Sequence, residues 1–249
     1  LVEIGVLTKV NNSEWGAPSF IISKKDGTVC FVTDFHKLNS MIKQNPYPIP
    51  HIRDMLLKVS NFQYATSLDL VMGFYNITLS EDSKEICTIT TPWGKYSYNR
   101  LPMGVCIAPD VFQEKMNNLF NELESVRCYI DDLLVITHGS YEKHLEELEK
   151  VFVLLEDAGL KCKFGKCFFC QDEIEYLGYI ITRDGIKPNP KKVQAILNIQ
   201  RPTTTSEVRH FVGMVQYYRD VWPGRSHNMK SMYTPIIRTS PSALTTIVR

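Results

Sequence analysis

Hydrophobic and polar positions alternate along some segments of the chain. Alternation over residues 19–23 and 29–33, with the turn 24–27 between them, predicts a β-hairpin. Two apolar runs on either side of Asp131 and Asp132 predict a second hairpin. Residues 174–181 alternate weakly and are expected to form one strand, which ends at the turn 183–185. The pattern therefore predicts antiparallel sheet.

Other segments follow a helical period. Pro109 suits the first turn of a helix that runs to about Leu119. Residues 141–160 predict an amphipathic helix ending near Gly159, with an apolar face of Leu145, Leu148, Val151, Phe152 and Leu155. Helices are also expected over 191–197 and after the capping box 204–207, the latter with Val208, Phe211, Val212, Val215 and Trp222 on one face. Together with the hairpins, these helices predict an α+β fold.

Length and composition agree with a folded protein. The chain has 249 residues, of which 44% are hydrophobic, enough for one large domain or two small ones. Its apolar runs are too short for a membrane-spanning helix, and no signal sequence opens it. Because the first residue is Leu1 rather than Met, we expect a fragment of a longer polypeptide. The 7 cysteines favour a reduced, intracellular protein.

Charge is distributed unevenly although the net charge is only +1. Residues 187–230 carry eight Lys or Arg and two acidic residues, a net charge of +6, whereas residues 1–186 are acidic overall. A solvated helix surface is the simple interpretation. The alternative is a segment that follows nucleic-acid phosphates beside a metal-binding body.

Three acidic residues are candidates for chemistry. Asp131 and Asp132 lie between two apolar strands, where Asp also favours ordinary tight turns. Asp69 ends another apolar run, 62 residues earlier. If these strands pair, the carboxylates converge, and such oxygens suit Mg²⁺ together with substrate phosphates. Two such ions would support in-line phosphoryl transfer.

The segment Tyr129-Ile130-Asp131-Asp132 resembles the Tyr-x-Asp-Asp motif of reverse transcriptases. Further segments are similar to that family in the same order, and gypsy-type LTR retrotransposon Pol polyproteins are the best match. These segments are residues 11–27 (NNSEWGAPSFIISKKDG), 31–39 (FVTDFHKLN), 65–77 (ATSLDLVMGFYNI), 91–113 (TPWGKYSYNRLPMGVCIAPDVFQ), 159–178 and 187–218. The resemblance covers about residues 1–230, and so many blocks in the same order make chance similarity an unsatisfactory explanation.

The resemblance implies a right-hand polymerase fold with fingers, an antiparallel palm sheet and a helical thumb. Fingers and palm would occupy residues 1–184, and a thumb or connection-like segment residues 185–249. It implies RNA-directed and DNA-directed DNA synthesis with two Mg²⁺ ions, for which Mn²⁺ is a possible substitute. The partners would be primed RNA or DNA template and deoxynucleoside triphosphates, without a membrane. Ribonuclease H, integrase and protease domains are expected beside it in the parent polyprotein, which would act in a cytoplasmic particle or the nucleus.

The resemblance also implies residue roles. Asp69 and Asp131 would bind both metal ions, and Asp132 would support them. Phe74 matches the aromatic gate that selects deoxynucleotides, with core packing as its alternative, and Met103 lines the nucleotide pocket. Lys24 and Lys25 would reach the triphosphate, with a solvated turn as the alternative. Primer and template would be bound by Tyr129, Leu177, Gly178, Tyr179, Lys191, Lys192 and Arg209.

Two positions depart from the family pattern. Cys30 and His36 stand where family members usually carry Arg, and a neutral thiol cannot grip a triphosphate as a guanidinium does. We therefore expect weak deoxynucleotide binding or a decayed copy that only binds nucleic acid. A Cys30→Arg variant with unchanged nucleotide affinity would contradict this hypothesis.

Two further groups of residues have ordinary interpretations. Cys162, Cys167 and Cys170 have the Cys-x4-Cys-x2-Cys spacing of an iron–sulfur ligand set, but no cysteine follows them to complete it. Structural cysteines are the simpler interpretation, and a metal-cluster protein is the alternative. His144 and His210 are expected to be surface or packing residues of helices.

Overall fold

The computed structural model describes residues 1–23, 27, 29–43, 45–57, 59 and 61–219. Lys24, Lys25 and Trp222 lie outside these residues. The chain divides into two compact units: unit 1 contains Leu1–Lys58 and Phe62–Asp172, and unit 2 contains Val59–Asn61 and Glu173–Arg249. Among the described residues, no helix is long and apolar enough to cross a membrane.

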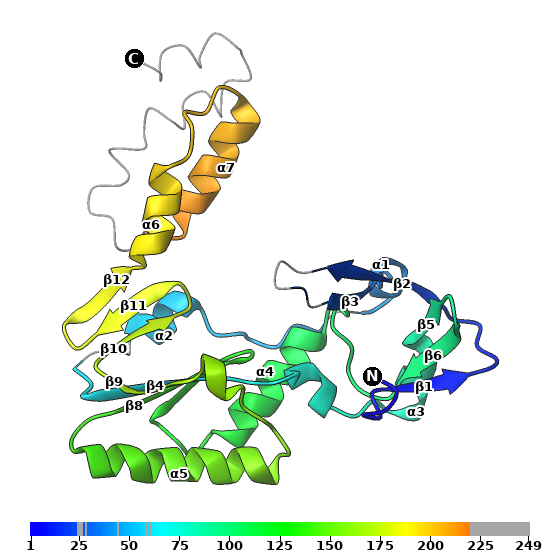
Figure 1. Cartoon of the computed structure of the whole chain (residues 1–249), viewed down its shortest axis with the longest axis horizontal. Helices are drawn as coiled ribbons and strands as arrows, with labels where there is room; N and C mark the ends of the chain where they lie inside the picture. The colour runs from blue at the N-terminus through cyan, green and yellow to red at the C-terminus, as the bar shows by residue number, and fades with distance from the viewer. Residues whose placement is uncertain (24–26, 28, 44, 58, 60, 220–249) are drawn as a thin grey trace. The chain divides into compact units, whose positions relative to one another are not determined.

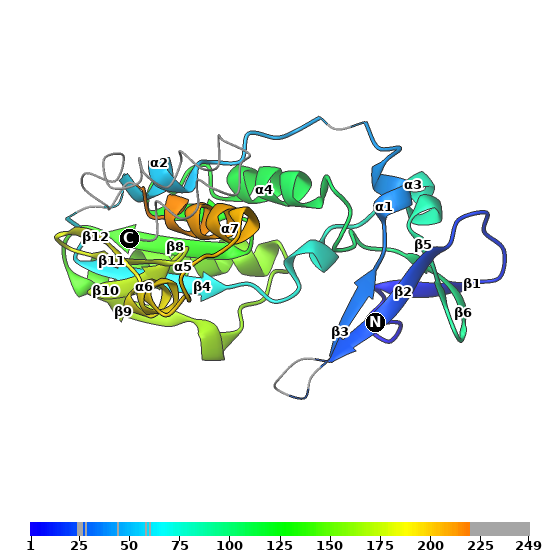
Figure 2. The same cartoon turned by 90° about the horizontal axis from the view of Figure 1, so that it is seen from above.

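Unit 1 contains a five-stranded sheet with the strand order β1-β6-β5-β2-β3. The pairing of β2 with β3, drawn in blue in Figure 2, confirms the hairpin predicted for residues 19–23 and 29–33. The short helices α1 and α3 contribute side chains to the core of this sheet. The elements are β1 (Leu7–Val10), β2 (Ala17–Ser23), β3 (Val29–Thr33), α1 (His36–Asn39), α3 (Glu81–Ile86), β5 (Thr88–Thr91) and β6 (Gly94–Tyr98). Its core includes Phe35, Leu38, Ile89 and Tyr98.

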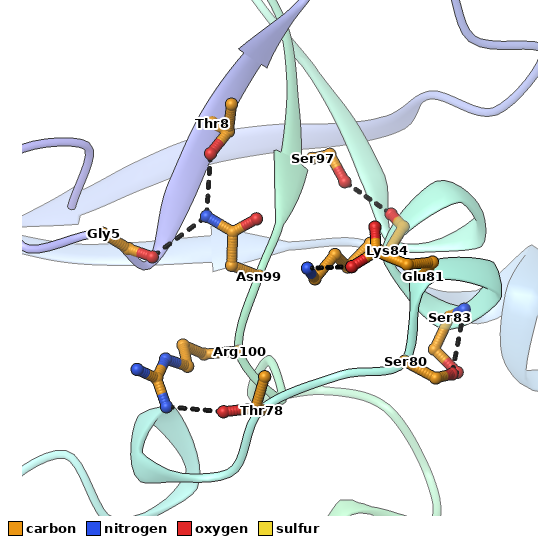
Figure 3. A network of polar contacts seen from close by, with 10 residues as sticks. All are labelled: Gly5, Thr8, Thr78, Ser80, Glu81, Ser83, Lys84, Ser97, Asn99 and Arg100. Atoms are coloured by element: carbon orange, nitrogen blue, oxygen red, sulfur yellow. Dashed lines mark hydrogen bonds and ion pairs between the residues drawn. The ribbon is translucent and has the colours of Figure 1, made fainter.

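Side-chain hydrogen bonds join the ends of this sheet (Figure 3). Asn99 Nδ2 donates to Gly5 O at 3.0 Å and to Thr8 Oγ1 at 2.8 Å, which ties the residue after β6 to the start of the chain. Ser97 Oγ donates to Lys84 O at 2.6 Å and so joins β6 to α3. These bonds fix the position of α3 and β1 against β6.

A four-stranded sheet with the order β7-β8-β4-β9 forms the other part of unit 1. Helices α4 and α5 pack against it, and α5 runs along the sheet in Figure 1. The elements are α2 (Ile52–Leu57), β4 (Tyr64–Asp69), the 3₁₀ helix η1 (Gly73–Asn76), α4 (Ala108–Leu119), β7 (Val126–Tyr129), β8 (Asp132–Thr137), α5 (Tyr141–Asp157), the 3₁₀ helix η2 (Phe164–Lys166) and β9 (Phe168–Gln171). The shared core includes Leu68, Phe112, Met116, Leu133 and Val151.

Helix α5 differs from the prediction in one face residue and in its end. Leu145, expected on the apolar face, is 43% exposed, whereas His144 is fully buried. The buried positions 144, 148, 151 and 155 follow the three- and four-residue spacing of one helix face, and His144 replaces Leu145 in that row. The helix ends at Asp157 rather than at 160, because Gly159 takes a φ of +70°.

His144 satisfies both ring nitrogens inside the core. Nε2 lies 2.8 Å from Thr66 Oγ1 on β4, and Nδ1 lies 2.8 Å from Thr137 Oγ1 on β8. Burial lowers the pKa of His144, and the charge of Glu147 opposes this shift. The neutral histidine therefore links the two central strands.

Unit 2 contains a three-stranded antiparallel sheet, β10-β11-β12, followed by helices α6 and α7. Its elements are β10 (Glu173–Tyr176), β11 (Tyr179–Thr182), β12 (Gly185–Pro188), α6 (Pro190–Leu197) and α7 (Thr205–Gln216). The single strand expected over 174–181 was wrong: Leu177 and Gly178, with φ of +46° and +74°, form a turn between two strands. The capping box at Thr204 and Glu207 is confirmed. The proposed domain boundary at 184/185 stays a prediction.

Candidate active site

The three candidate carboxylates lie at one end of the four-stranded sheet. Asp69 ends β4 and Asp132 begins β8, and the two residues are direct partners in the antiparallel ladder. Asp131 occupies the two-residue turn between β7 and β8. Side chains of directly opposed residues leave the same face of a sheet, so Asp69 and Asp132 lie side by side. The strand pairing that would let these acids converge is therefore present.

Burial and mutual repulsion make this cluster unfavourable when all its members are charged. Asp131 Oδ1 is buried, and no described residue donates a hydrogen bond to it. Burial, followed by the charges of Asp132 and Asp69, raises the pKa of Asp131. Burial and the charge of Asp69 raise the pKa of Asp132, while Lys166 lowers it. A cation at this position would relieve both effects.

Lys166 is the nearest counter-charge that the structure shows. Its Nζ lies 3.2 Å from Asp69 Oδ2 and donates a hydrogen bond to it. The two residues are 97 positions apart in the sequence. The backbone brings them together because Lys163 N donates to Asp69 O at 2.8 Å, which fixes η2 beside the end of β4. Lys166 therefore offsets part of the charge of Asp69.

Gly73 makes room for Asp131. A methyl group at Gly73 would overlap Asp131 Oδ1 and would lie 2.8 Å from Phe112 Cζ. Neither neighbour can withdraw easily, because Phe112 is only 1% exposed and Asp131 is held in its turn. The absence of a side chain at position 73 is thus a steric requirement of the site.

The donor set fits Mg²⁺ in its chemistry. All three side chains offer carboxylate oxygens, and the buried unpartnered oxygen of Asp131 is aimed at no protein donor among the described residues. Among the residues that the structure describes, no group of three or more His, Cys, Asp or Glu side chains already surrounds a common metal position. Because Mg²⁺ uses few protein ligands and completes its shell with water and phosphates, Asp69 and Asp131 are sufficient candidates.

The candidate nucleotide-binding residues are spread over several elements of unit 1. Phe74 follows Gly73 on η1, and its ring packs 5.3 Å from that of Phe112. Met103 is 48% exposed beside Gly104. Cys30 is half-buried on β3. His36 is exposed at the start of α1, where its Nδ1 lies 2.5 Å from Asp34 Oδ1.

In unit 2, the candidate primer-binding turn is held by tyrosines. Tyr217 Oη donates to Leu177 O at 2.5 Å, and Tyr218 Oη donates to Gly178 O at 3.2 Å. Tyr179 Oη in turn donates to Tyr217 O at 2.6 Å. The rings of Tyr179 and Tyr217 stack with centroids 5.3 Å apart. The turn is therefore fixed to the end of α7.

The other candidate residues for binding primer and template lie on separate elements. Tyr129 ends β7 and pairs with Asp132. Lys191 and Lys192 are exposed in the first turn of α6, which Asn189 caps by accepting from Lys191 N at 2.9 Å. Arg209 is exposed on α7. The binding roles of all these residues stay predictions.

The three clustered cysteines do not form a metal site among the described residues. Cys167 Sγ donates to Lys163 O at 3.4 Å, and Cys162 and Cys170 pack against the hydrophobic core. Burial raises the pKa of the Cys162 thiol to about 11. These features agree with structural cysteines.

Sequence reasoning assigned no role to Lys166, Gly73 or Gln113. Gln113 reaches the Asp131 turn from α4, where its Oε1 accepts from Ile130 N at 2.8 Å. The signals were weak for different reasons: Lys166 is remote in sequence, glycines follow strands often, and a glutamine in a helix is usually exposed. Only the proximity of Gly73 to Asp69 was visible in the sequence.

Comparison with known proteins decides the family. A family model described as "Reverse transcriptase (RNA-dependent DNA polymerase)" matches residues 22–181, which is more than half of the chain. The chain belongs to the reverse transcriptase family. Curated relatives are Pol polyproteins of transposons. That of transposon 297 of Drosophila melanogaster is 37% identical over 233 residues, which cover 91% of this chain and 22% of that protein. Transposon Tf2-7 polyprotein of Schizosaccharomyces pombe is 31% identical over 211 residues, covering 84% and 16%.

Solved reverse transcriptase structures confirm the predicted α+β polymerase fold. A foamy viral protease-reverse transcriptase in complex with double-stranded DNA matches with a TM-score of 0.89 and 26% identity, covering 99% of this chain and 45% of that one. The same kind of protein in complex with an RNA/DNA hybrid matches with a TM-score of 0.84 and 26% identity, covering 99% and 34%. This reverse transcriptase domain spans about a fifth of the curated Pol polyproteins named above. The expected retrotransposon family is thus confirmed.

Proposed function

We propose that this chain extends a primer on an RNA or DNA template, using deoxynucleoside triphosphates and two divalent cations. The observation that carries the proposal is the opposition of Asp69 and Asp132 across β4 and β8, with the buried, unpartnered oxygen of Asp131 beside them. Family membership supports the reaction class, and the two foamy viral proteins are in complex with duplex nucleic acid.

Asp69 and Asp131 would hold the ions, and Asp132 would add negative charge to the site. When bound, Mg²⁺ supplies Lewis-acid stabilisation to the attacking and leaving oxygens of in-line transfer, with Mn²⁺ as a substitute. Lys166 would share Asp69 with a bound cation, because its Nζ donates a hydrogen bond to Asp69 Oδ2. Phe74, packed against Phe112, would present a fixed ring edge that excludes a 2′-hydroxyl.

The nucleic acid would be bound mainly through its phosphates and sugars, with sequence supplied by template pairing. Lys191, Lys192 and Arg209 are exposed and suit this role. In unit 2, the turn at Leu177 and Gly178 and the neighbouring Tyr179 would contact primer or template. Tyr129 of unit 1 is proposed to bind primer or template as well. We also propose that the chain acts within a larger Pol polyprotein, in a cytoplasmic particle or the nucleus.

Primer extension on an RNA template with four deoxynucleotides and Mg²⁺ tests this function. We expect extension by the wild-type chain and by Asp157→Asn, a matched control for an exposed acid at the end of α5. Asp131→Asn should lose extension because it removes a charged metal ligand. Salt-sensitive duplex binding without any extension would instead favour a non-catalytic binding role.

A further inference from the structure

Gln113 is a fully buried polar side chain whose hydrogen bonds lead to the carboxylate turn. It lies on α4 and is 0% exposed. Nε2 donates to Cys128 O at 3.0 Å, and Oε1 accepts from Ile130 N at 2.8 Å. A buried amide is stable only when its polar atoms are paired, so the backbone on both sides of Tyr129 and the Gln113 amide fix each other.

The turn needs such support because its backbone is strained. Ile130 has a φ of +53°, which is unfavourable for a β-branched residue. Cys128 Sγ donates to Ile130 O at 3.3 Å, and Leu70 N donates to Asp131 O at 3.4 Å. Burial and the charges of Asp131 and Asp132 raise the pKa of Cys128 to about 12, so its thiol remains a donor. The amide N–H of the strained residue itself is satisfied by Gln113.

A chain of hydrogen bonds extends from Gln113 away from the turn. Gln113 Nε2 also donates to Asn117 Oδ1 at 2.8 Å, and Asn117 Nδ2 donates to Tyr47 Oη at 3.0 Å. Positions 113 and 117 are four apart and therefore share one face of α4. Tyr47 belongs to the irregular segment 45–50. The Ile130 N–H can only donate and the Cys128 C=O can only accept, so these two backbone groups fix which end of the Gln113 amide is the donor. Asn117 then accepts from Gln113 Nε2 and donates to Tyr47, which extends the hydrogen-bonded support of this amide.

We propose that Gln113 is a positioning residue that sets the direction of Asp131 and Asp132, and that Asn117 and Tyr47 support its amide from the other side. The proposal rests on the proposed function, since it assigns those carboxylates to the metal ions. Asp131 Oδ1 has no hydrogen-bond donor of its own in the described chain, so its direction depends on the backbone that Gln113 holds.

Three single variants each remove the side-chain hydrogen bonds of one residue in this network. They are Gln113→Met, Asn117→Leu and Tyr47→Phe. Gln113→Met keeps an unbranched side chain of similar size but leaves Ile130 N–H and Cys128 C=O unpaired. We expect kcat to fall about 10- to 100-fold in Gln113→Met, as for other residues that orient metal ligands. The loss should be smaller in Asn117→Leu and smallest in Tyr47→Phe, and KM for the primer–template should stay within about twofold of the wild type.

Met116→Ala is the matched control, because it removes a buried side chain of the same helix that shares the core but, among the described residues, makes no hydrogen bond to the turn. It should lower the unfolding midpoint while keeping kcat. If Met116→Ala and Gln113→Met have the same kcat at equal stability, Gln113 acts only through the core and the proposal is overturned.

Titration with Mn²⁺ alone, followed by its electron paramagnetic resonance signal, separates this proposal from the proposed function. The half-saturation concentration should rise about tenfold in Gln113→Met and remain unchanged in Met116→Ala. If the wild-type chain extends no primer, the proposed function fails, but this titration still decides the role of Gln113. Equal Mn²⁺ half-saturation in wild type and Gln113→Met would overturn it.

Discussion

Two short turns of this chain are built alike but held differently. Tyr129–Asp132 and Tyr176–Tyr179 each join antiparallel strands through two residues, and each contains a non-glycine residue with positive φ. The first turn is held from inside unit 1 by the buried amide of Gln113. The second is held in unit 2 by Tyr217 and Tyr218, of which Tyr217 is 43% exposed. Water can compete for the second set of bonds but not for the first.

This difference agrees with what each turn would have to do. Carboxylates that bind metal ions must be placed within a fraction of an ångström, which a dry and fully bonded core provides. A turn that contacts a moving primer needs fixed carbonyls but tolerates small adjustments. The comparison therefore predicts that damage near the first turn reduces turnover, whereas damage at the second weakens binding.

The largest effect is expected from Gly73→Ala. The added methyl group overlaps Asp131 Oδ1 and the Phe112 ring, and a displacement of about 1 Å at a reacting group can cost about 100-fold in rate. Single-nucleotide extension measures this loss. Gly165→Ala is the control, since a Cβ there meets nothing within 4 Å, and it should extend primers like the wild type. Normal turnover in Gly73→Ala would show that the first turn is less tightly confined than its contacts indicate.

A smaller effect is expected from the double variant Tyr217→Phe with Tyr218→Phe. It removes both hydrogen bonds to the second turn but keeps the ring packing of Tyr179. Each lost bond is worth about 1 kcal/mol, so the loss of both should raise KM for the primer–template by up to about 30-fold while kcat stays near that of the wild type. Steady-state kinetics separate the two constants. A lower kcat with an unchanged KM would remove the proposed distinction between the turns.

The smallest expected effect is a loss of local stability at acidic pH. His144 has a lowered pKa in the folded protein, so its contribution to stability is complete above the ordinary histidine pKa of about 6.5 and is lost as pH falls below it. The hydrogen-exchange protection factor is the intrinsic amide exchange rate at a given pH divided by the observed rate. Between pH 7 and 5 it should therefore fall more in β4 and β8, which His144 links, than in β10 and β11. In His144→Gln this difference between strands should disappear. A uniform loss of protection in the wild type would mean that other groups control the acid response.

The sequence predicts the parts of this fold that depend on neighbouring residues. The β2–β3 hairpin, α4 and the Thr204 capping box follow from alternation, Pro109 and a four-residue motif. The turn at Leu177 was missed by periodicity because its strain is offset by tyrosines about 40 residues later. Leu145 was placed inside because a histidine in the core row is unusual, and only its two threonine partners explain it.

The candidate site also contains residues that the sequence indicates and residues that only the tertiary structure reveals. Asp69, Asp131 and Asp132 are visible in the sequence because they stand at the ends of apolar runs, and the resemblance to reverse transcriptases gives them their roles. Lys166 contacts Asp69, 97 positions away, and Gln113 contacts Ile130, 17 positions away. Only the tertiary structure brings these residues together. Periodicity carries no information about such pairs.

The division into units has a consequence for how the chain is made. Val59–Asn61 belongs to unit 2 although the residues on both sides belong to unit 1, so the backbone passes between the units three times. Val59 is 2% exposed, and Asn61 N donates to Arg183 O at 3.3 Å. During translation this segment leaves the ribosome well over 100 residues before its partner Arg183. Unit 2 is therefore completed last, and cleavage between Asp172 and Glu173 yields no fragment that contains all of it.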